Sequence, residues 1–383
     1  MSFPHAAWLS DDHALFAKTA RRFVEAEITA HLEAHRKAGI VPREVWAKAA
    51  DAGILGATIP EAYGGAGCPD SFDLITMYEQ GRGGDSGWGF AIQTIVSHYI
   101  QAYATEAQKE RWLPKLASGE HVAAIAMSEP GTGSDLQNVQ TFAARDGDFY
   151  RLTGAKTFIT NGQTADLICV VAKTDRSQGA QGTSLLMVET EGLEGFKRGR
   201  NLEKLGMKSA DTSELFFEDC KVPTHFVLGG KEGQGFFQLM LQLPFERLAI
   251  GVLSLGAIDC AIEHTLAYTR ERKAFGKPIS RFQNSRFKLA EVKTKAEVLR
   301  SFLADCIGRQ DLGKLDAATA SMAKWWGSEI QGEIIDECLQ LFGGYGFMME
   351  YPIAHLYADA RAQRIYGGTN EIMKELVARS LKL

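Results

Sequence analysis

Residues 149–160 read FYRLTGAKTFIT, a β-type run inside a chain otherwise dominated by helical patterns, and this change of texture decides the fold class. Further runs of the same type follow between turn residues. They are LICVVAKT at 167–174, TSLLMVET at 183–190 and ELFFEDCKV at 214–222. Their spacing predicts a compact antiparallel barrel or sandwich in the middle of the chain.

Helical patterns lie on both sides of these runs. In DHALFAKTARRFVEAEITAHLEAH, at 12–35, apolar residues recur at steps of three and four. Long helical patterns return at 287–309 and 321–342. The order helix, sheet, helix predicts an α+β fold that is mainly α. We expect three domains: an N-terminal helical domain at 1–120, a central β domain at 121–230 and a C-terminal helical domain at 231–383.

Composition narrows the class of protein. The 383 residues are 45% hydrophobic, enough for a large core, and the net charge of -5 comes from interspersed acids and bases. No run of Lys or Arg could follow a nucleic acid, and no apolar run reaches the length of a membrane span. The chain start lacks the features of a secretion signal, and the six cysteines are scattered singly. We therefore expect a cytoplasmic protein with reduced thiols.

The sequence gives little sign of a metal site or a nucleophile. His31 and His35 share a helix face with Glu27, but solvated faces often carry such sets, and no HExxH motif accompanies them. A GxSxG elbow is absent, as is a cysteine beside a plausible base. We predict no metal site.

Glycine-rich segments are the remaining candidates for chemistry. In SEPGTGSDL, at 128–136, Gly131 and Gly133 free backbone N–H groups to face an anion, although the loop taken alone is equally consistent with a plain turn. Capping or turn chemistry explains each of the other segments singly. They are KTFITNG at 156–162, RKAFGKPI at 272–279, LQLFGGYGF at 339–347 and IYGGTNEI at 365–372.

Taken together, these five motifs, in this order and after PEAYGGAG at 60–67, resemble the acyl-CoA dehydrogenase family. The resemblance covers essentially the whole chain. It implies a helical N-terminal domain, a central β domain and a C-terminal four-helix bundle. It also implies a homotetramer built as a dimer of dimers, and symmetric assembly is the common case.

The resemblance implies a bound FAD. The segment 125–134 then lies along the flavin, with the Ser128 hydroxyl near the ring edge. Phe158 stands where many members carry Trp, and Thr160 follows as a flavin neighbour. The segment's implied flavin contacts are Ile125, Met127, Ser128, Gly133 and Ser134, of which Ser134 would also meet the acyl-CoA. The implied contacts to pyrophosphate and adenine, across a subunit interface, are Arg272, Phe275, Gln283, Gln340, Gly343 and Gly344.

The reaction that the resemblance implies is α,β-dehydrogenation of an acyl-CoA thioester, in which a carboxylate removes the α-proton. Many members place that carboxylate directly after the Tyr of the last motif, but here Tyr366, a substrate-side position, precedes Gly367. Gly367 retains an N–H that can donate to the thioester oxygen. Thr369 or Asn370 can cap the following helix. The resemblance places Thr369 and Glu371 beside the flavin, and Glu371, in the first turn of that helix, is not expected to be the base.

Another segment supplies a candidate base. LQLPFERLAIG, at 241–251, resembles the segment from which the long-chain and isovaleryl branches supply the base, with Glu246 in that position. Phe245 and Arg247 match substrate-side positions. Without the resemblance, Glu246 and Arg247 would be interpreted as an exposed helical pair.

Several features of the activity stay open in the sequence. With glycine at 367 we hypothesise a wide pocket for long or methyl-branched acyl chains, while Trp88 either closes its deep end or belongs to the core. The expected electron acceptor is an electron-transferring flavoprotein. The alternatives are an acyl-CoA oxidase, a dehydrogenase of carrier-bound acyl groups, and a flavin-binding relative that has lost catalysis.

Overall fold

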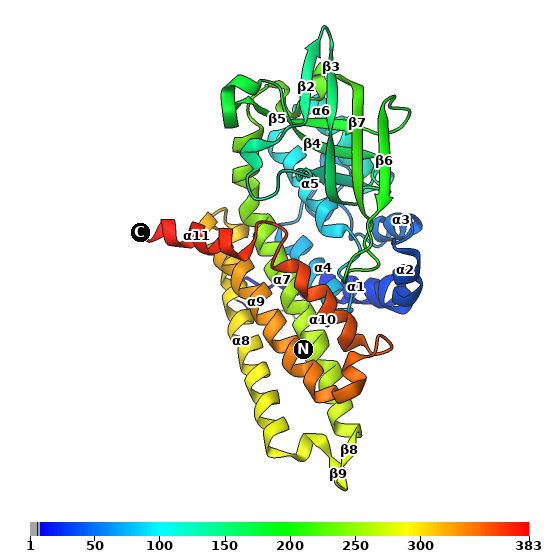
Figure 1. Cartoon of the computed structure of the whole chain (residues 1–383), viewed down its shortest axis with the longest axis vertical. Helices are drawn as coiled ribbons and strands as arrows, with labels where there is room; N and C mark the ends of the chain where they lie inside the picture. Colours follow the sequence, from blue (N-terminus) through cyan, green and yellow to red (C-terminus); the bar gives the residue numbers. More distant parts are fainter. Residues whose placement is uncertain (1–5, 7, 383) are drawn as a thin grey trace.

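The computed structural model describes residue 6 and residues 8–382, and three regions follow one another along the chain. In Figure 1 the sheet occupies one end of the molecule and the long C-terminal helices extend to the other. The N-terminal helices contact both, since α5 packs on β1 and α4 packs on α7. This arrangement confirms the α+β, mainly α, fold.

The N-terminal region is helical, and its helix α4 is almost entirely buried. Its helices are α1 (Asp11–Phe23), α2 (Leu32–Ala38), α3 (Glu44–Asp51), α4 (Ser71–Arg82), α5 (Phe90–Tyr103) and α6 (Glu106–Ala117). Trp88, just before α5, is 2% exposed and packs against Phe23, Trp46 and Phe90. The core alternative for Trp88 is therefore confirmed.

The central region is a seven-stranded sheet in the order β1-β4-β2-β3-β7-β6, with β5 paired to β4. Its strands are β1 (Ala123–Ala126), β2 (Phe142–Asp146), β3 (Phe149–Thr160), β4 (Leu167–Lys173), β5 (Thr183–Glu189), β6 (Phe196–Asn201) and β7 (Thr212–Pro223). The predicted runs are β3, β4, β5 and β7. The sheet is not purely antiparallel, contrary to the prediction from the sequence, because β1 pairs in parallel with β4. Parallel strands need a connection that crosses back to the same end of the sheet, and here that connection includes β2 and β3.

The C-terminal region is a bundle of long helices. They are α7 (Gly235–Glu271), α8 (Gln283–Asp311), α9 (Ala317–Phe342), α10 (Pro352–Gln363) and α11 (Asn370–Ser380), with the short hairpin β8 (Lys273–Ala274) and β9 (Lys277–Pro278) after α7. At 37 residues, α7 is about 56 Å long. It contacts the sheet through β5 and the bundle through α8, α9 and α10. Among the described helices, none is both long and apolar enough to cross a membrane.

A buried charged cluster ties the bundle to the N-terminal region. Asp259 of α7 is fully buried and accepts two hydrogen bonds from Arg300 Nη2 of α8, at 2.6 and 2.8 Å. The hydroxyl of Tyr78 from α4 donates to the same carboxylate at 2.5 Å. Three helices from two regions therefore depend on one buried carboxylate.

Asp259→Ala is expected to lower the free energy of unfolding by about 3–5 kcal/mol, because it removes the buried carboxylate to which Arg300 Nη2 and the Tyr78 hydroxyl donate. Urea denaturation followed by circular dichroism measures this loss. The control is Glu218→Ala, since Glu218 pairs with Lys197 at 2.8 Å while both side chains are 63% exposed. Its expected loss is below about 1 kcal/mol. Equal losses in the two variants would contradict the assigned role of Asp259.

Candidate active site

The carboxyl group of Glu246 is buried where α7 meets α5. Glu246 is 7% exposed, and the Tyr99 hydroxyl donates to its Oε1 at 2.9 Å. Burial raises the pKa of Glu246 to about 7, against the opposing effects of Tyr99, Arg247 and His98. A carboxyl group with a pKa near 7 can act as a general base at neutral pH.

Arg247 is also buried, so the alternative of an exposed helical pair is wrong. Its Nη1 donates to Ser321 Oγ of α9 at 3.4 Å, while its Nε is buried and finds no acceptor among the described residues. Arg247 therefore faces α9 while Glu246 faces α5. Phe245, 3% exposed, packs its ring on His98 at 4.3 Å.

The turn at Gly367 lies against the same stretch of α7. Gly367 and Gly368 have φ of +67° and +91°, a region that favours glycine. A Cβ at 367 would stand 2.3 Å from Cδ1 of Ile250, one helical turn after Glu246. Gly367 therefore lies against α7 one helical turn from Glu246. The Gly367 N–H has no acceptor in the part of the chain that the structure describes.

A buried lysine fixes this turn. Lys324 of α9 is fully buried and donates from Nζ to Gly368 O at 2.7 Å and to Asn370 Oδ1 at 2.9 Å. Burial, together with Arg247, lowers the pKa of Lys324 to about 8. The role of Lys324 was not predicted from the sequence, although a lysine inside a long apolar helix is a visible signal.

The residues around the turn differ from Glu246 in burial. Tyr366 is half-buried, and its pKa is raised by burial and by Asp359. Thr369 caps α11 by accepting from Ile372 N at 3.4 Å. Glu371 is exposed, and hydrogen bonds to its own backbone and to Thr369 lower its pKa. A low pKa makes Glu371 a weaker base than Glu246.

A second buried ion pair supports the loop after β1. Lys156 Nζ donates to Glu129 Oε1 at 2.9 Å and to the carbonyl oxygens of Met127 and Val171 at 3.0 and 2.7 Å. Lys156 is 1% exposed. Lys156 therefore fixes the residues on either side of Ser128 by hydrogen bonds. This role of Lys156 was not predicted from the sequence.

The loop itself is open. Ile125, Met127 and Ser128 are half-buried, whereas Gly133 and Ser134 are exposed. Cβ atoms at Gly131 and Gly133 would touch nothing within 4 Å. Among the described residues, the N–H groups of Gly131, Gly133 and Ser134 find no acceptor, so they remain free to bind a ligand.

Two phenylalanines are held in strained, exposed conformations. Phe158 has φ +60° and is 70% exposed, while Phe275 has φ +51° and is 96% exposed. Thr160, two residues beyond Phe158, is half-buried. Left-handed backbone at a bulky residue costs free energy and is concentrated at binding sites. The two rings are therefore available to a bound molecule or a second subunit.

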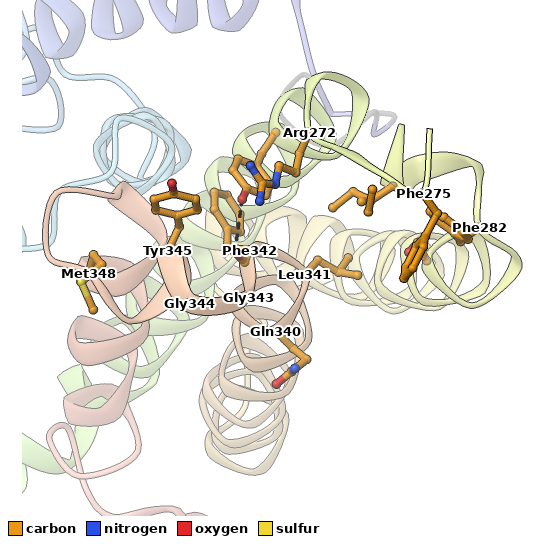
Figure 2. A pocket seen from close by; sticks show the side chains of 14 residues that line it. Arg272, Phe275, Phe282, Gln340, Leu341, Phe342, Gly343, Gly344, Tyr345 and Met348 are labelled. Carbon is orange, nitrogen blue, oxygen red and sulfur yellow. Dashed lines mark hydrogen bonds between the residues drawn. The ribbon is translucent and has the colours of Figure 1, made fainter. Parts of the chain in front are cut away.

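Phe275 also lines a cavity of about 660 Å³ between α7, the start of α8 and the end of α9 (Figure 2). The Arg272 guanidinium lies over the ring of Tyr345 at 5.7 Å from its centre. Gly343 and Gly344 line the same cavity, and a Cβ on either would meet nothing within 4 Å. Gln340 is an exposed lining residue, and Gln283 is exposed at the first position of α8.

These features fit FAD in two separate places. Free N–H groups and the Phe158 ring suit a flavin at the loop after β1, while Arg272 and the open glycines suit a pyrophosphate. Arg272 follows Glu246 by 26 residues along α7, a helical distance of about 39 Å. The cavity around Arg272 therefore lies far along α7 from Glu246.

A desolvated carboxyl group, a glycine-rich loop with unpaired N–H groups and two exposed aromatic rings suit an oxidoreductase that binds an aromatic cofactor. Among the described residues, no group of His, Cys, Asp or Glu is placed to hold a metal ion. Family models of the acyl-CoA dehydrogenase N-terminal, middle and C-terminal domains match residues 10–120, 124–220 and 233–382. The chain belongs to the acyl-CoA dehydrogenase family, whose members are FAD enzymes.

Individual relatives agree. The long-chain specific acyl-CoA dehydrogenase of Mus musculus is 47% identical over 375 residues, 97% of this chain and 87% of that protein. The crystal structure of an acyl-CoA dehydrogenase from Geobacillus kaustophilus has a TM-score of 0.96 and 44% identity, covering 99% of this chain and 100% of that one. A glutaryl-CoA dehydrogenase from Mycobacterium smegmatis in complex with FADH2 has a TM-score of 0.91 and 29% identity, covering 97% and 95%. Other relatives are named for short-chain and aryl acrylate substrates, so the comparisons show the family and not the acyl group.

Gly367→Ala is expected to lower stability by about 1–3 kcal/mol, because it adds backbone strain and a contact with Ile250. Thermal unfolding of the purified protein measures the loss. Gly64→Ala is the control for strain alone, since Gly64 has φ +84° and nothing within 4 Å of a Cβ. Adding Ile250→Val, which removes Cδ1, should recover the part of the stability loss in Gly367→Ala that exceeds the loss in Gly64→Ala. No recovery in the double variant would show that Ile250 is not the obstacle.

Proposed function

We propose that this chain oxidises acyl-CoA thioesters between the α and β carbons, with Glu246 as the base. The observation that carries the proposal is the buried Glu246 carboxyl, whose pKa of about 7 suits proton abstraction, beside the Gly367 turn. When bound, FAD accepts the β-hydrogen as a hydride.

The chain's own residues supply the proton chemistry. The Glu246 carboxylate takes the α-proton, and the free Gly367 N–H donates to the thioester oxygen as negative charge develops there. Lys324 holds the carbonyl of Gly368 and thereby fixes the direction of that N–H. Ser134 and Arg247 are assigned to the bound acyl-CoA, the first by its exposure and the second by its unpaired Nε.

We propose long or branched acyl chains as the substrate. The 47% identity to a long-chain enzyme supports this proposal. The glycine at 367 supports it less than the sequence suggested, because Ile250 occupies the room beside it. An electron-transferring flavoprotein stays the proposed acceptor, and a cytoplasmic location stays a prediction.

We further propose an assembly in which neighbouring chains complete each other's cofactor site, within a homotetramer. The distance of about 39 Å between Glu246 and Arg272 along α7 supports it. So does the exposure of Phe275, whose side chain is 96% exposed in the described part of the chain.

Glu246→Gln is expected to abolish the bleaching of flavin absorbance when acyl-CoAs are added without oxygen, because the amide cannot take up a proton. The control is Glu375→Gln, on the exposed face of α11, which should bleach like the unmodified protein. Bleaching that persists in Glu246→Gln would contradict the assignment of Glu246 as the base and leave Glu371 as the candidate.

The same titration distinguishes the alternatives for the substrate and the acceptor. Preferential bleaching by long or branched chains supports the proposed acyl group, and comparable bleaching by short straight chains counts against it. Peroxide release in air would indicate an oxidase. Absence of bleaching by any acyl-CoA would favour a carrier-bound substrate or a non-catalytic flavoprotein.

Co-expression of Arg272→Ala with Glu246→Gln is expected to give more activity than either variant alone. Arg272→Ala should weaken FAD binding by about 10- to 100-fold, because a charge-assisted contact is lost. In a mixed dimer, a chain with Glu246 intact receives Arg272 from its Glu246→Gln partner, and one complete site results. Flavin reduction by the co-expressed pair, compared with each variant alone, measures this. Failure to restore activity would place the cofactor contacts within one chain.

A further inference from the structure

The candidate base has a hydrogen-bond partner in the N-terminal region. Tyr99 of α5 is fully buried, and its hydroxyl donates to Oε1 of Glu246 at 2.9 Å. No other hydrogen bond to this carboxyl group is found among the described residues. Oε1 is therefore engaged, while Oε2 remains available.

Two successive residues of α5 contact two successive residues of α7. His98 packs its ring on Phe245 at 4.3 Å, and Tyr99 bonds to Glu246. His98 is itself fixed, since its Nε2 lies 3.2 Å from Asp73 Oδ2. Neither helix can rotate at this point without breaking both contacts, so the distance from Tyr99 to Glu246 is set by the packing of the two helices.

We infer that Tyr99 is a positioning residue for the base: its hydroxyl holds Oε1 of Glu246 and so directs Oε2 toward the α-proton of the substrate. This inference rests on the proposed function of Glu246. Proton transfer depends on the orientation of the accepting oxygen, and a carboxylate held at one oxygen has fewer rotamers to search. The hydrogen bond also stabilises the ionised form that acts as a base.

Tyr99 acts as a donor and not as a base. Burial, together with Glu246, raises the pKa of Tyr99 well above its ordinary value, so the phenol keeps its proton. A neutral hydroxyl beside a carboxylate makes a charge-assisted hydrogen bond, stronger than one between neutral groups.

The other titratable groups that face Glu246 come from three elements. Arg247 lies on α7 itself, and His98 lies on α5. The Nε2 atom of His98 in turn lies 3.2 Å from Asp73 of α4 and 3.8 Å from Asp70, which precedes that helix. Cys169 of β4 stays a neutral thiol, because burial raises its pKa to about 12. Removing the Tyr99 hydroxyl therefore leaves Arg247 and His98 to stabilise the carboxylate.

The test is Tyr99→Phe, which keeps the ring and removes only the donor. The rate of flavin reduction by a saturating acyl-CoA is measured by stopped flow as a function of pH. For a base, the rate rises with pH through its pKa, so losing a donor to the ionised form shifts this rise upward. We expect a shift of about 1 pH unit and, at a pH equal to the original midpoint, about a fivefold lower rate.

Tyr103→Phe is the matched control. Tyr103 lies one turn further along α5 and donates to the backbone oxygen of Gln238, not to Glu246. Its pH profile should match that of the unmodified protein. A second variant moves the other way: 3-fluorotyrosine at position 99 is more acidic and donates more strongly, so its profile should shift to lower pH.

The outcomes distinguish the hypothesis that Glu246 is the base from the hypothesis that Tyr99 positions it. If Glu246→Gln abolishes reduction but neither Tyr99 variant moves the pH profile, the role of Tyr99 is overturned and the base remains. A uniform fall in rate with an unmoved profile, matched by the same fall in Tyr103→Phe, would show that Tyr99 serves packing only. If Glu246→Gln still reduces its flavin, the proposed base fails before Tyr99 is considered.

Discussion

The structure depends on how α7 buries carboxylates, because removing a charge from water costs several kcal/mol unless partners replace the water. Asp259 and Glu246 lie on this one helix, and each accepts a hydrogen bond from a tyrosine of the N-terminal region. Asp259 also receives a guanidinium, from Arg300, at 2.6 Å. Glu246 has no such ion pair among the described residues, since its neighbour Arg247 faces Ser321. The first carboxylate is paired and structural, and the second keeps a raised pKa, as the proposed base requires.

The length of α7 is the second constraint. A helix of 37 residues carries Glu246 near its beginning and ends directly before Arg272. A straight helix cannot fold back, so the base and the cavity around Arg272 face different neighbours. An aromatic ring as exposed as that of Phe275 is then better understood as one side of an interface than as a fault in packing. This separation along one helix is the structural basis of the proposal that neighbouring chains complete each other's cofactor site.

The sequence predicted the fold better than it predicted the site. β3, β4, β5 and β7 were recognisable because their residues are apolar and bounded by turns, and those signals are local. The burial of Glu246 was not local: in the sequence it stands beside Arg247 like any surface pair. Lys156 and Lys324 were missed for a related reason, since a lysine is almost never fully buried unless its partners are also buried. Those partners, Glu129 and Asn370, are distant in sequence.

Gly367 shows why base and turn have to be considered together. A carboxylate carried at 367 would need a Cβ where Cδ1 of Ile250 now lies, 2.3 Å away. Ile250 and Glu246 are one turn apart on α7, so the helix that brings a base close to the turn also presents the side chain that closes the turn to a base of its own. Lys324 then holds the Gly368 carbonyl and keeps the glycine backbone against that surface. In this chain, a side chain at 367 would require Ile250 to shift and the backbone to keep a positive φ, and the turn keeps the one group that glycine can supply, its N–H.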